Sequence, residues 1–111
     1  VCLPLYSNPN TPEAKAFRER AIEHPEVAIH FFGGEMASMD MRAEIANIAC
    51  PTLVIGGTLD PVTPTLCSQV IADSIGENAC LHMFEGCGHG PHRDDPDGAE
   101  KVMRHFLATS T

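Results

Sequence analysis

The feature that most constrains the fold is a short apolar run, Leu53, Val54 and Ile55, which lies between Pro51 and two glycines. An unbroken apolar run with β-branched residues between Pro and Gly is typical of a strand that is buried on both faces. Such strands occur in parallel sheets whose two faces are covered by helices. The sequence therefore predicts an α/β fold built around a strand over residues 51–57.

The chain beyond this strand continues with the pattern of a helix, a second strand and a second helix. Thr63 and Pro64 form a cap and first-turn pair that predicts a helix start, and Gly76 is placed to end that helix. Residues 79–84 predict the second strand, and the last helix is expected to begin near Asp95. A strand–helix–strand unit predicts parallel pairing through a right-handed crossover. The expected apolar stripes are Leu66, Cys67, Val70, Ile71 and Ile75 in the first helix, and Ala99, Val102, Met103, Phe106 and Leu107 in the second.

The first 48 residues carry no strong strand pattern. Thr11 and Pro12 predict a helix that runs to about Glu23 and is stopped by Pro25, and residues 27–32 are compatible with a strand or an irregular segment. Two strands do not form an independent parallel sheet, so further strands are expected from another part of the protein, a second chain or a partner subunit. A second short helix is expected after Asp40, with Met41, Ile45 and Ile48 on one face.

Charge and cysteine content narrow the function classes. The chain has 15 acidic and 7 basic residues, a formal charge of −8, which disfavours nucleic acid and anionic membranes as partners. No stretch has the length of a membrane span or the pattern of a signal peptide. The cysteines contain no C-x-x-C pair, which favours free, mostly buried thiols in a reducing, cytoplasmic compartment, with a disulfide left open. They are Cys2, Cys50, Cys67, Cys80 and Cys87.

Two residue types that carry catalysis follow the two expected strands. Asp60 comes directly after the first strand, and His89 lies in the glycine-rich loop 86–90 after the second. Because the carboxyl ends of parallel strands meet at one edge of a sheet, we expect these side chains to meet there. The carboxylate would then fix the tautomer of the imidazole and stabilise its cation. Taken singly, each residue is also typical of an ordinary loop.

Two segments of the chain resemble parts of the α/β-hydrolases. Residues 50–64 resemble the acid-bearing strand and loop of these enzymes, and residues 84–96 resemble their histidine loop. The likeness is closest to the serine aminopeptidases that are similar to proline iminopeptidase. It implies a C-terminal β-α-β-α portion of an α/β-hydrolase sheet over residues 49–111, preceded by the end of a helical cap over residues 1–48.

The resemblance also implies roles for individual residues. Asp60 takes the place of the triad acid, His89 that of the general base, and Glu35 that of a cap carboxylate which holds a substrate's terminal ammonium. It implies no cofactor and no metal. The substrate would be a small or peptide-like amide or ester, cleaved by acyl transfer to water.

The sequence departs from this family in one important respect. No serine stands in the G-x-S-x-G motif that carries the nucleophile. We therefore expect a fragment of a serine hydrolase that supplies the acid and the histidine, with the nucleophile outside this chain. Its partner would be the remaining N-terminal part of the hydrolase, or a second copy paired through the sheet edges. The serines are Ser7, Ser38, Ser68, Ser74 and Ser110.

Other hypotheses stay open at this point. The chain could be a non-catalytic binding or oligomerising module derived from a hydrolase. Cys87 could serve as a thiol nucleophile beside His89. A metal could be bound by Cys87, His89, His92 and one of the acids Asp94 and Asp95, although the spacing fits no standard zinc pattern. The two acids are more typical of charges at a helix N-terminus.

Overall fold

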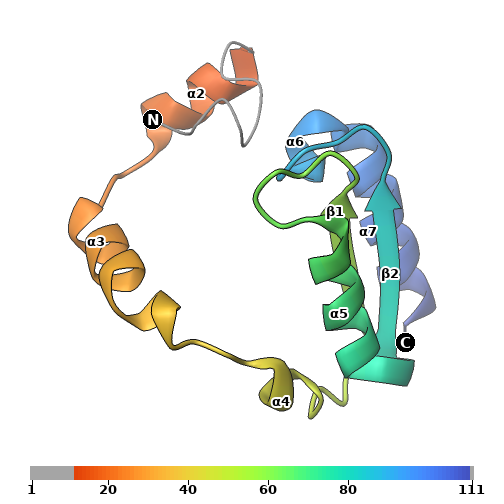
Figure 1. Cartoon of the computed structure of the whole chain (residues 1–111). Coiled ribbons are helices and arrows are strands. Elements are labelled where there is room, and N and C mark those ends of the chain that lie inside the picture. Colours follow the sequence, from red (N-terminus) through yellow and green to blue (C-terminus); the bar gives the residue numbers. More distant parts are fainter. Residues whose placement is uncertain (1–11, 111) are drawn as a thin grey trace.

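The computed structural model describes residues 12–110, and the side chains of all of these except residues 12–14 and 17. Its C-terminal half is a strand–helix–strand–helix unit, drawn in green to blue in Figure 1. The strands are β1, Thr52–Gly57, and β2, Ala79–Phe84, and the long helices are α5, Thr65–Ile75, and α7, Pro96–Thr109. Two short helical turns, η2 over Gly76–Asn78 and α6 over Pro91–Asp94, lie in the connections.

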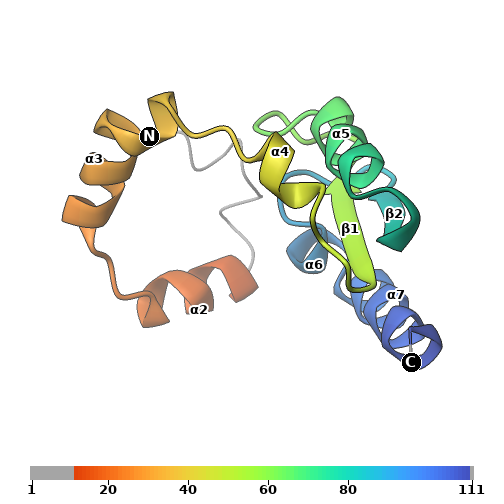
Figure 2. The ribbon, with the colours of Figure 1, turned by 90° about the horizontal axis from the view of Figure 1, so that it is seen from below.

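The two strands pair in parallel over their whole length. Thr52 lies opposite Ala79 at one end of the ladder and Gly57 opposite Phe84 at the other. Helix α5 connects the strands and covers one face of the sheet, while α7 lies on the opposite face (Figures 1 and 2). The expected α/β architecture with parallel strands is therefore confirmed.

Each face of the sheet holds one small apolar cluster. Side chains alternate between the faces, so that neighbouring positions of β1 point to opposite sides. Val54 packs with Ala72 and Ile75 of α5. On the other face, Ile55 packs against a cluster that includes Phe84 and Ala99. The strand is thus flanked on both faces, although only part of it is fully buried.

Helix α5 faces the sheet with a different side from the one its apolar stripe predicts. Its buried residues are Ser68, Ala72 and Ile75, whereas Leu66 is 71% exposed and Ile71 41% exposed. The reason is close packing, because a Cβ atom on Gly56 of β1 would lie 2.5 Å from the hydroxyl of Ser68. Small residues on α5 fit against this glycine, so most of the bulkier stripe faces away from the sheet.

The end of α5 and the start of α7 match the sequence, whereas α5 starts at Thr65 with Pro64, not Thr63, as its N-cap. Gly76 ends α5 with a φ of 75°, a backbone conformation that glycine adopts at little cost. Asp95 caps α7, and its side chain accepts a hydrogen bond from the backbone N–H of Gly98. The stripe of α7 is covered at its start, where Ala99 is buried, and open at its end, where Leu107 is 69% exposed.

The N-terminal part is an arc of helices that extends away from the sheet (Figures 1 and 2). Among the described residues, Ile45 of α4, Arg42–Ile45, and Ile48, which follows this helix, pack on the sheet unit and contact the cluster around Val54. Met41, expected on the same face, is 55% exposed. Asp40 accepts a hydrogen bond from the backbone N–H of Arg42 at the start of this element. The elements are α2, Pro12–Arg20; α3, Pro25–Gly33; η1, Glu35–Ala37; and α4, Arg42–Ile45.

Two expectations about this arc are wrong. The first helix ends at Arg20 rather than near Glu23, and residues 27–32 form the middle of α3 rather than a strand or an irregular segment. Pro25 begins α3 at a position where its missing N–H costs nothing. A helix satisfies its own backbone groups, whereas a strand here would need a neighbour. The expected cap at Thr11 lies outside the described residues.

The described cysteines are free, but they are not mostly buried. Cys50, Cys67 and Cys80 are exposed, and only Cys87 is buried. Cys67 is exposed because it belongs to the side of α5 that faces away from the sheet. Cys2 lies outside the described residues. Within residues 12–110, no helix combines the length and the apolar character that crossing a bilayer requires.

Candidate active site

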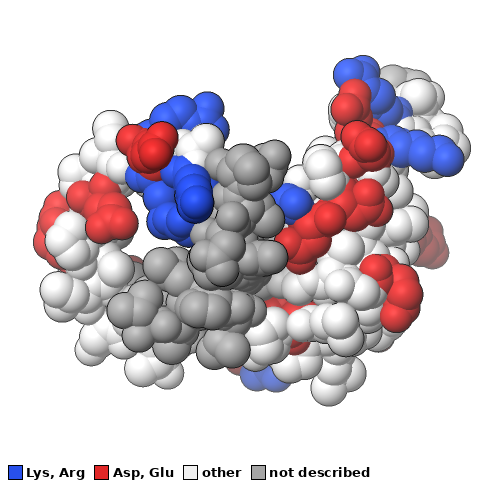
Figure 3. Space-filling model, turned by 90° about the horizontal axis from the view of Figure 1, so that it is seen from above, with Lys and Arg blue, Asp and Glu red and all other residues white. Residues whose placement is uncertain are grey.

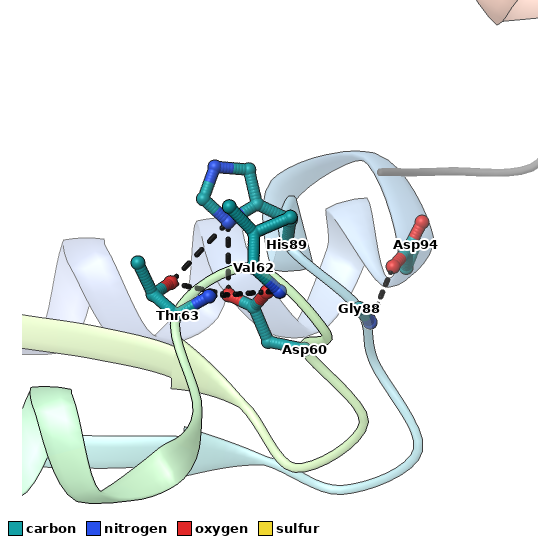
Figure 4. Close-up of polar contacts among 6 residues, drawn as sticks. All are labelled: Asp60, Val62, Thr63, Gly88, His89 and Asp94. Atoms are coloured by element: carbon teal, nitrogen blue, oxygen red, sulfur yellow. Dashed lines mark hydrogen bonds and ion pairs between the residues drawn. The ribbon is translucent and has the colours of Figure 1, made fainter. Parts of the chain in front are cut away.

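Asp60 and His89 meet beyond the carboxyl ends of the two strands, as their positions in the sequence predict. The Nδ1 atom of His89 lies 2.9 Å from Oδ2 of Asp60. The Asp60 side chain is only 5% exposed, and the His89 side chain is 33% exposed. Figure 4 shows both side chains between the loop after β1 and the loop after β2. The fold thus brings together two residues that lie 29 positions apart.

The Asp60 carboxylate is held by its own loop as well as by His89. Its Oδ1 accepts hydrogen bonds from the backbone N–H groups of Val62, at 2.8 Å, and Thr63, at 3.0 Å. Its Oδ2 accepts a hydrogen bond from the Thr63 hydroxyl at 2.6 Å. Burial raises the pKa of Asp60, but the hydrogen bonds from Thr63, His89 and Val62 together outweigh it and lower the pKa well below its usual range. The carboxylate is therefore ionised at neutral pH.

This ionisation fixes the tautomer of neutral His89. An ionised carboxylate only accepts hydrogen bonds, so the proton of the Asp60 contact must sit on Nδ1 of the imidazole. The basic lone pair is then on Nε2, which points away from Asp60 in Figure 4. This is the tautomer that a general base of the Ser-His-Asp type needs.

Glycines allow the two loops to cross at close range. A side chain at Gly57, the last residue of β1, would collide with the carbonyl oxygens of Cys87 and Gly88. The loops are also joined by hydrogen bonds, from the Leu59 N–H to the Cys87 carbonyl at 2.9 Å and from the Gly86 N–H to the Thr58 hydroxyl at 2.9 Å. These contacts fix the position of the histidine loop relative to the loop that carries Asp60.

A further carboxylate anchors the histidine loop from its far side. Oδ2 of Asp94, in α6, accepts a hydrogen bond from the backbone N–H of Gly88 at 2.7 Å (Figure 4). Gly88 directly precedes His89, so this bond fixes the backbone from which the imidazole projects. Asp95 thus lies at the N-terminus of α7, as the sequence predicts, whereas Asp94 also holds the histidine loop, which the sequence does not predict.

The other candidate residues are not brought to this pair. Glu35 lies in η1, on the N-terminal arc, with its side chain 66% exposed and its Oε1 atom 3.3 Å from Nε2 of His30. Cys87 is buried, and burial together with Asp94 and Asp95 raises the pKa of its thiol, which disfavours a nucleophilic thiolate. Among residues 12–110, no group of three or more His, Cys, Asp or Glu side chains is placed to hold a metal.

Several acidic side chains lie on the face of the sheet unit that is seen from the carboxyl ends of its strands. Figure 3 looks onto the edge of the sheet at which the strands end, and acidic side chains run across the half that holds the sheet and α7. Asp94, Asp95 and Asp97 contribute to this charge at α6 and the start of α7. Part of the acidic excess of the sequence thus lies on the elements that follow the histidine loop.

Three residues that shape the site have no distinctive signal in the sequence. Thr63 looks like a helix cap, yet the N-cap of α5 is Pro64 and makes no side-chain cap. Gly57 looks like one of many turn glycines, and Asp94 like a dipole charge. Their roles depend on contacts between segments that are distant in the sequence, such as the carbonyls of Cys87 and Gly88 against Gly57.

Comparison with known proteins places the sequence in a family. The sequence model of the TAP-like protein family of α/β-hydrolases matches residues 34–111. A protein assigned as the carbamate hydrolase RutD of Pseudomonas syringae pv. syringae is 32% identical over 74 residues, which cover 67% of this chain. The pimeloyl-acyl-carrier-protein methyl ester esterase of Photobacterium profundum is 25% identical over 72 residues, 65% of this chain. The proline iminopeptidase of Heyndrickxia coagulans is 27% identical over 74 residues, 67% of this chain.

In each case the match spans a small share of the relative. It covers 28% of the carbamate hydrolase, 28% of the esterase and 25% of the iminopeptidase. The names of these relatives all denote hydrolytic enzymes, and each name gives a different substrate. The matched family and the α/β architecture agree with each other, and on this ground the chain belongs to the TAP-like family of α/β-hydrolases.

Proposed function

We propose that residues 1–111 supply the acid and the base of a serine hydrolase that transfers an acyl group from an ester or amide to water. The observation that carries this proposal is the 2.9 Å contact between the buried, ionised Asp60 and Nδ1 of His89. A carboxylate in that position orients the imidazole and stabilises the cation that forms when the ring takes a proton.

In the proposed reaction, His89 acts first as a base and then as an acid in each of the two halves. Its Nε2 accepts the proton of a serine hydroxyl as the serine oxygen attacks the substrate carbonyl carbon. The same nitrogen then protonates the leaving alcohol or amine, and the acyl-enzyme forms. In the second half of the reaction, Nε2 takes a proton from water, which attacks the acyl carbon, and returns that proton to the serine. Asp60 stays ionised throughout.

The nucleophile of this proposal lies outside this chain, since no serine of the chain stands in a G-x-S-x-G motif. Four serines lie among the described residues, and the side chains of three of them are engaged in local hydrogen bonds or are buried. Ser38 and Ser74 donate their hydroxyls to backbone carbonyls of their own segments, and Ser68 is buried against the sheet. The open sides of α5 and α7 favour a neighbour that covers them, either the remaining part of the hydrolase or a second copy of the chain. The same proposal includes the division of the chain into the end of a helical cap, residues 1–48, and the C-terminal part of the hydrolase core, residues 49–111.

The substrate is proposed only at the level of an acyl compound. The related proteins bear the names of a carbamate hydrolase, a methyl ester esterase and an iminopeptidase, so they do not select one leaving group. The finer proposal, an aminopeptidase similar to proline iminopeptidase, uses Glu35 to bind the substrate's ammonium group. It requires the N-terminal arc to approach the site, and Glu35→Gln would then raise KM for substrates with a free amino group and leave acetylated ones unchanged.

Fluorophosphonate labelling tests the proposal directly, with the intact mass of every species in the preparation measured alongside. We expect a labelled serine, and we expect His89→Ala to slow labelling by several orders of magnitude. His92→Ala is the matched control, because His92 is exposed and lies three residues away in the same segment. Unchanged labelling of His89→Ala would remove His89 from the mechanism. A preparation that takes up no probe at all would favour the non-catalytic module instead.

A further inference from the structure

One side chain outside the proposed acid–base pair touches both of its members. The Thr63 hydroxyl donates to Oδ2 of Asp60 at 2.6 Å, and the same oxygen lies 3.3 Å from Nδ1 of His89. The Asp60 oxygen that Thr63 contacts is the one that accepts from His89, at 2.9 Å. Figure 4 shows the three polar groups in this triangle. The proton on Nδ1 therefore faces two acceptors, the Asp60 carboxylate and the Thr63 hydroxyl oxygen.

The Thr63 hydroxyl does not cap helix α5, although its position in the sequence predicts that it would. Thr63 precedes Pro64 at the start of α5, where a threonine ordinarily caps the helix, and a missing cap costs a helix about 1 kcal/mol. Here α5 begins without a side-chain cap, while the hydroxyl is turned to Asp60. Local rules of stability that are broken in this way are concentrated at functional sites.

We propose that Thr63 is a positioning residue, whose hydroxyl holds the Asp60 carboxylate and the His89 imidazole in the single arrangement that general-base catalysis needs. The backbone N–H groups of Val62 and Thr63 already fix Oδ1 of Asp60, so the Thr63 hydroxyl acts on Oδ2, the oxygen that contacts the histidine. Without the hydroxyl, the carboxylate keeps its loop contacts through Oδ1 and its bond to His89, but Oδ2 loses a donor and the Nδ1–H of His89 loses one of its two acceptors. This role rests on the proposed function, since it concerns the same pair.

Two substitutions separate the hydroxyl from the shape of the side chain. Thr63→Val keeps the volume and fills the place of the hydroxyl with a methyl group, which also keeps water from replacing it. Thr63→Ser keeps the hydroxyl and removes the methyl group. Because Thr63 is an exposed residue, we expect a moderate effect, with kcat of Thr63→Val lowered about fivefold to tenfold, KM within twofold, and Thr63→Ser close to the wild type.

The test is made on the complete protein, with active-site titration so that rates refer to folded enzyme. A kcat of Thr63→Val equal to that of the wild type, or a Thr63→Ser variant as slow as Thr63→Val, would overturn the proposal. A purely structural role would lower the melting temperature and the amount of folded enzyme, and would leave kcat per folded molecule unchanged.

A second readout does not depend on the nucleophile. In NMR spectra, the Nδ1–H proton of His89 should exchange with water at least fivefold faster in Thr63→Val than in the wild type and Thr63→Ser. Equal exchange in all three proteins would overturn the positioning role. A wild type that neither labels nor hydrolyses refutes the proposed function instead, and the exchange rates then decide the geometry of Thr63 by themselves.

Discussion

The hydroxyl of Thr58 accepts a hydrogen bond from the backbone N–H of Gly86 at 2.9 Å, and this contact joins the two loops that carry the acid and the histidine. It lies one residue beyond the end of β1 and two beyond the end of β2. The loops therefore leave the sheet as one unit. Much of the precision of the site comes from these backbone contacts rather than from the two titratable side chains.

Replacement of Gly57 by alanine should disrupt this crossing. The added Cβ collides with the carbonyls of Cys87 and Gly88, which cannot move without displacing the backbone that leads to His89. We expect a loss of about 1–3 kcal/mol in the free energy of unfolding, measured by urea denaturation, together with a large loss of activity. Gly33→Ala is the control, because no atom lies within 4 Å of its added Cβ, and its stability should change by less than about 0.5 kcal/mol. Equal behaviour of the two variants would contradict the crowding argument.

Adjacent aspartates should show separate effects on activity and stability. Asp94→Ala removes the acceptor that holds the Gly88 N–H, so kcat should fall roughly tenfold as the histidine loop loosens. Asp95→Ala removes the cap of α7 and should lower the free energy of unfolding by about 1 kcal/mol with little change in kcat. Steady-state kinetics and urea denaturation of both variants make the comparison, and a larger kcat effect in Asp95→Ala would refute the assignment.

Loss of the Asp60 charge should abolish most catalysis and preserve the fold. Asp60→Asn keeps the size of the side chain, but its amide can donate to His89 and so favour the wrong tautomer. By analogy with serine proteases, we expect kcat to fall by about 10⁴. Circular dichroism serves to check that the secondary structure is retained. A folded variant with near-normal turnover would exclude Asp60 from the mechanism.

The lowered pKa of Asp60 also predicts how stability depends on pH. A carboxyl group with a lower pKa in the folded state stabilises the protein fully above its unfolded pKa, about 4, and loses that contribution as the pH falls below this value. Urea midpoints of the wild type and Asp60→Asn, measured from pH 7 to pH 3, should therefore differ most at neutral pH and approach each other in acid. A difference that stays constant over this range would show that the carboxylate is not stabilised by folding.

The sequence predicts the sheet unit well because its signals are local. Pro51 and the glycines delimit β1, Gly76 ends α5, and Asp95 begins α7, and each acts through contacts within a few residues. The meeting of Asp60 and His89 follows from parallel pairing alone, which requires no knowledge of side-chain packing.

The predictions from the sequence are wrong where contacts between distant segments determine the local structure. Residues 27–32 have the composition of a strand, but they form α3, and among residues 12–110 the only sheet is the one made by β1 and β2. The side of α5 that faces the sheet depends on the fit of Ser68 against Gly56 as well as on the apolar contacts of Ala72 and Ile75 with Val54. The hydroxyl of Thr63 is diverted from capping by a carboxylate three residues earlier, and the capping pattern does not reveal this competition.

The two halves of the site differ in how far along the chain their contacts reach. Apart from His89, the bonds to Asp60 come from Val62 and Thr63, whereas His89 joins it across 29 residues. Closing a short loop takes far less time than pairing two parallel strands through a helix. We therefore expect the contacts of Asp60 within its own loop to form early in folding, and its contact with His89 to form when β2 docks beside β1. On this order, the Asp60–His89 contact marks the completion of the sheet, and we expect a loosening of β2 to separate His89 from Asp60 before it disturbs the loop that holds Asp60.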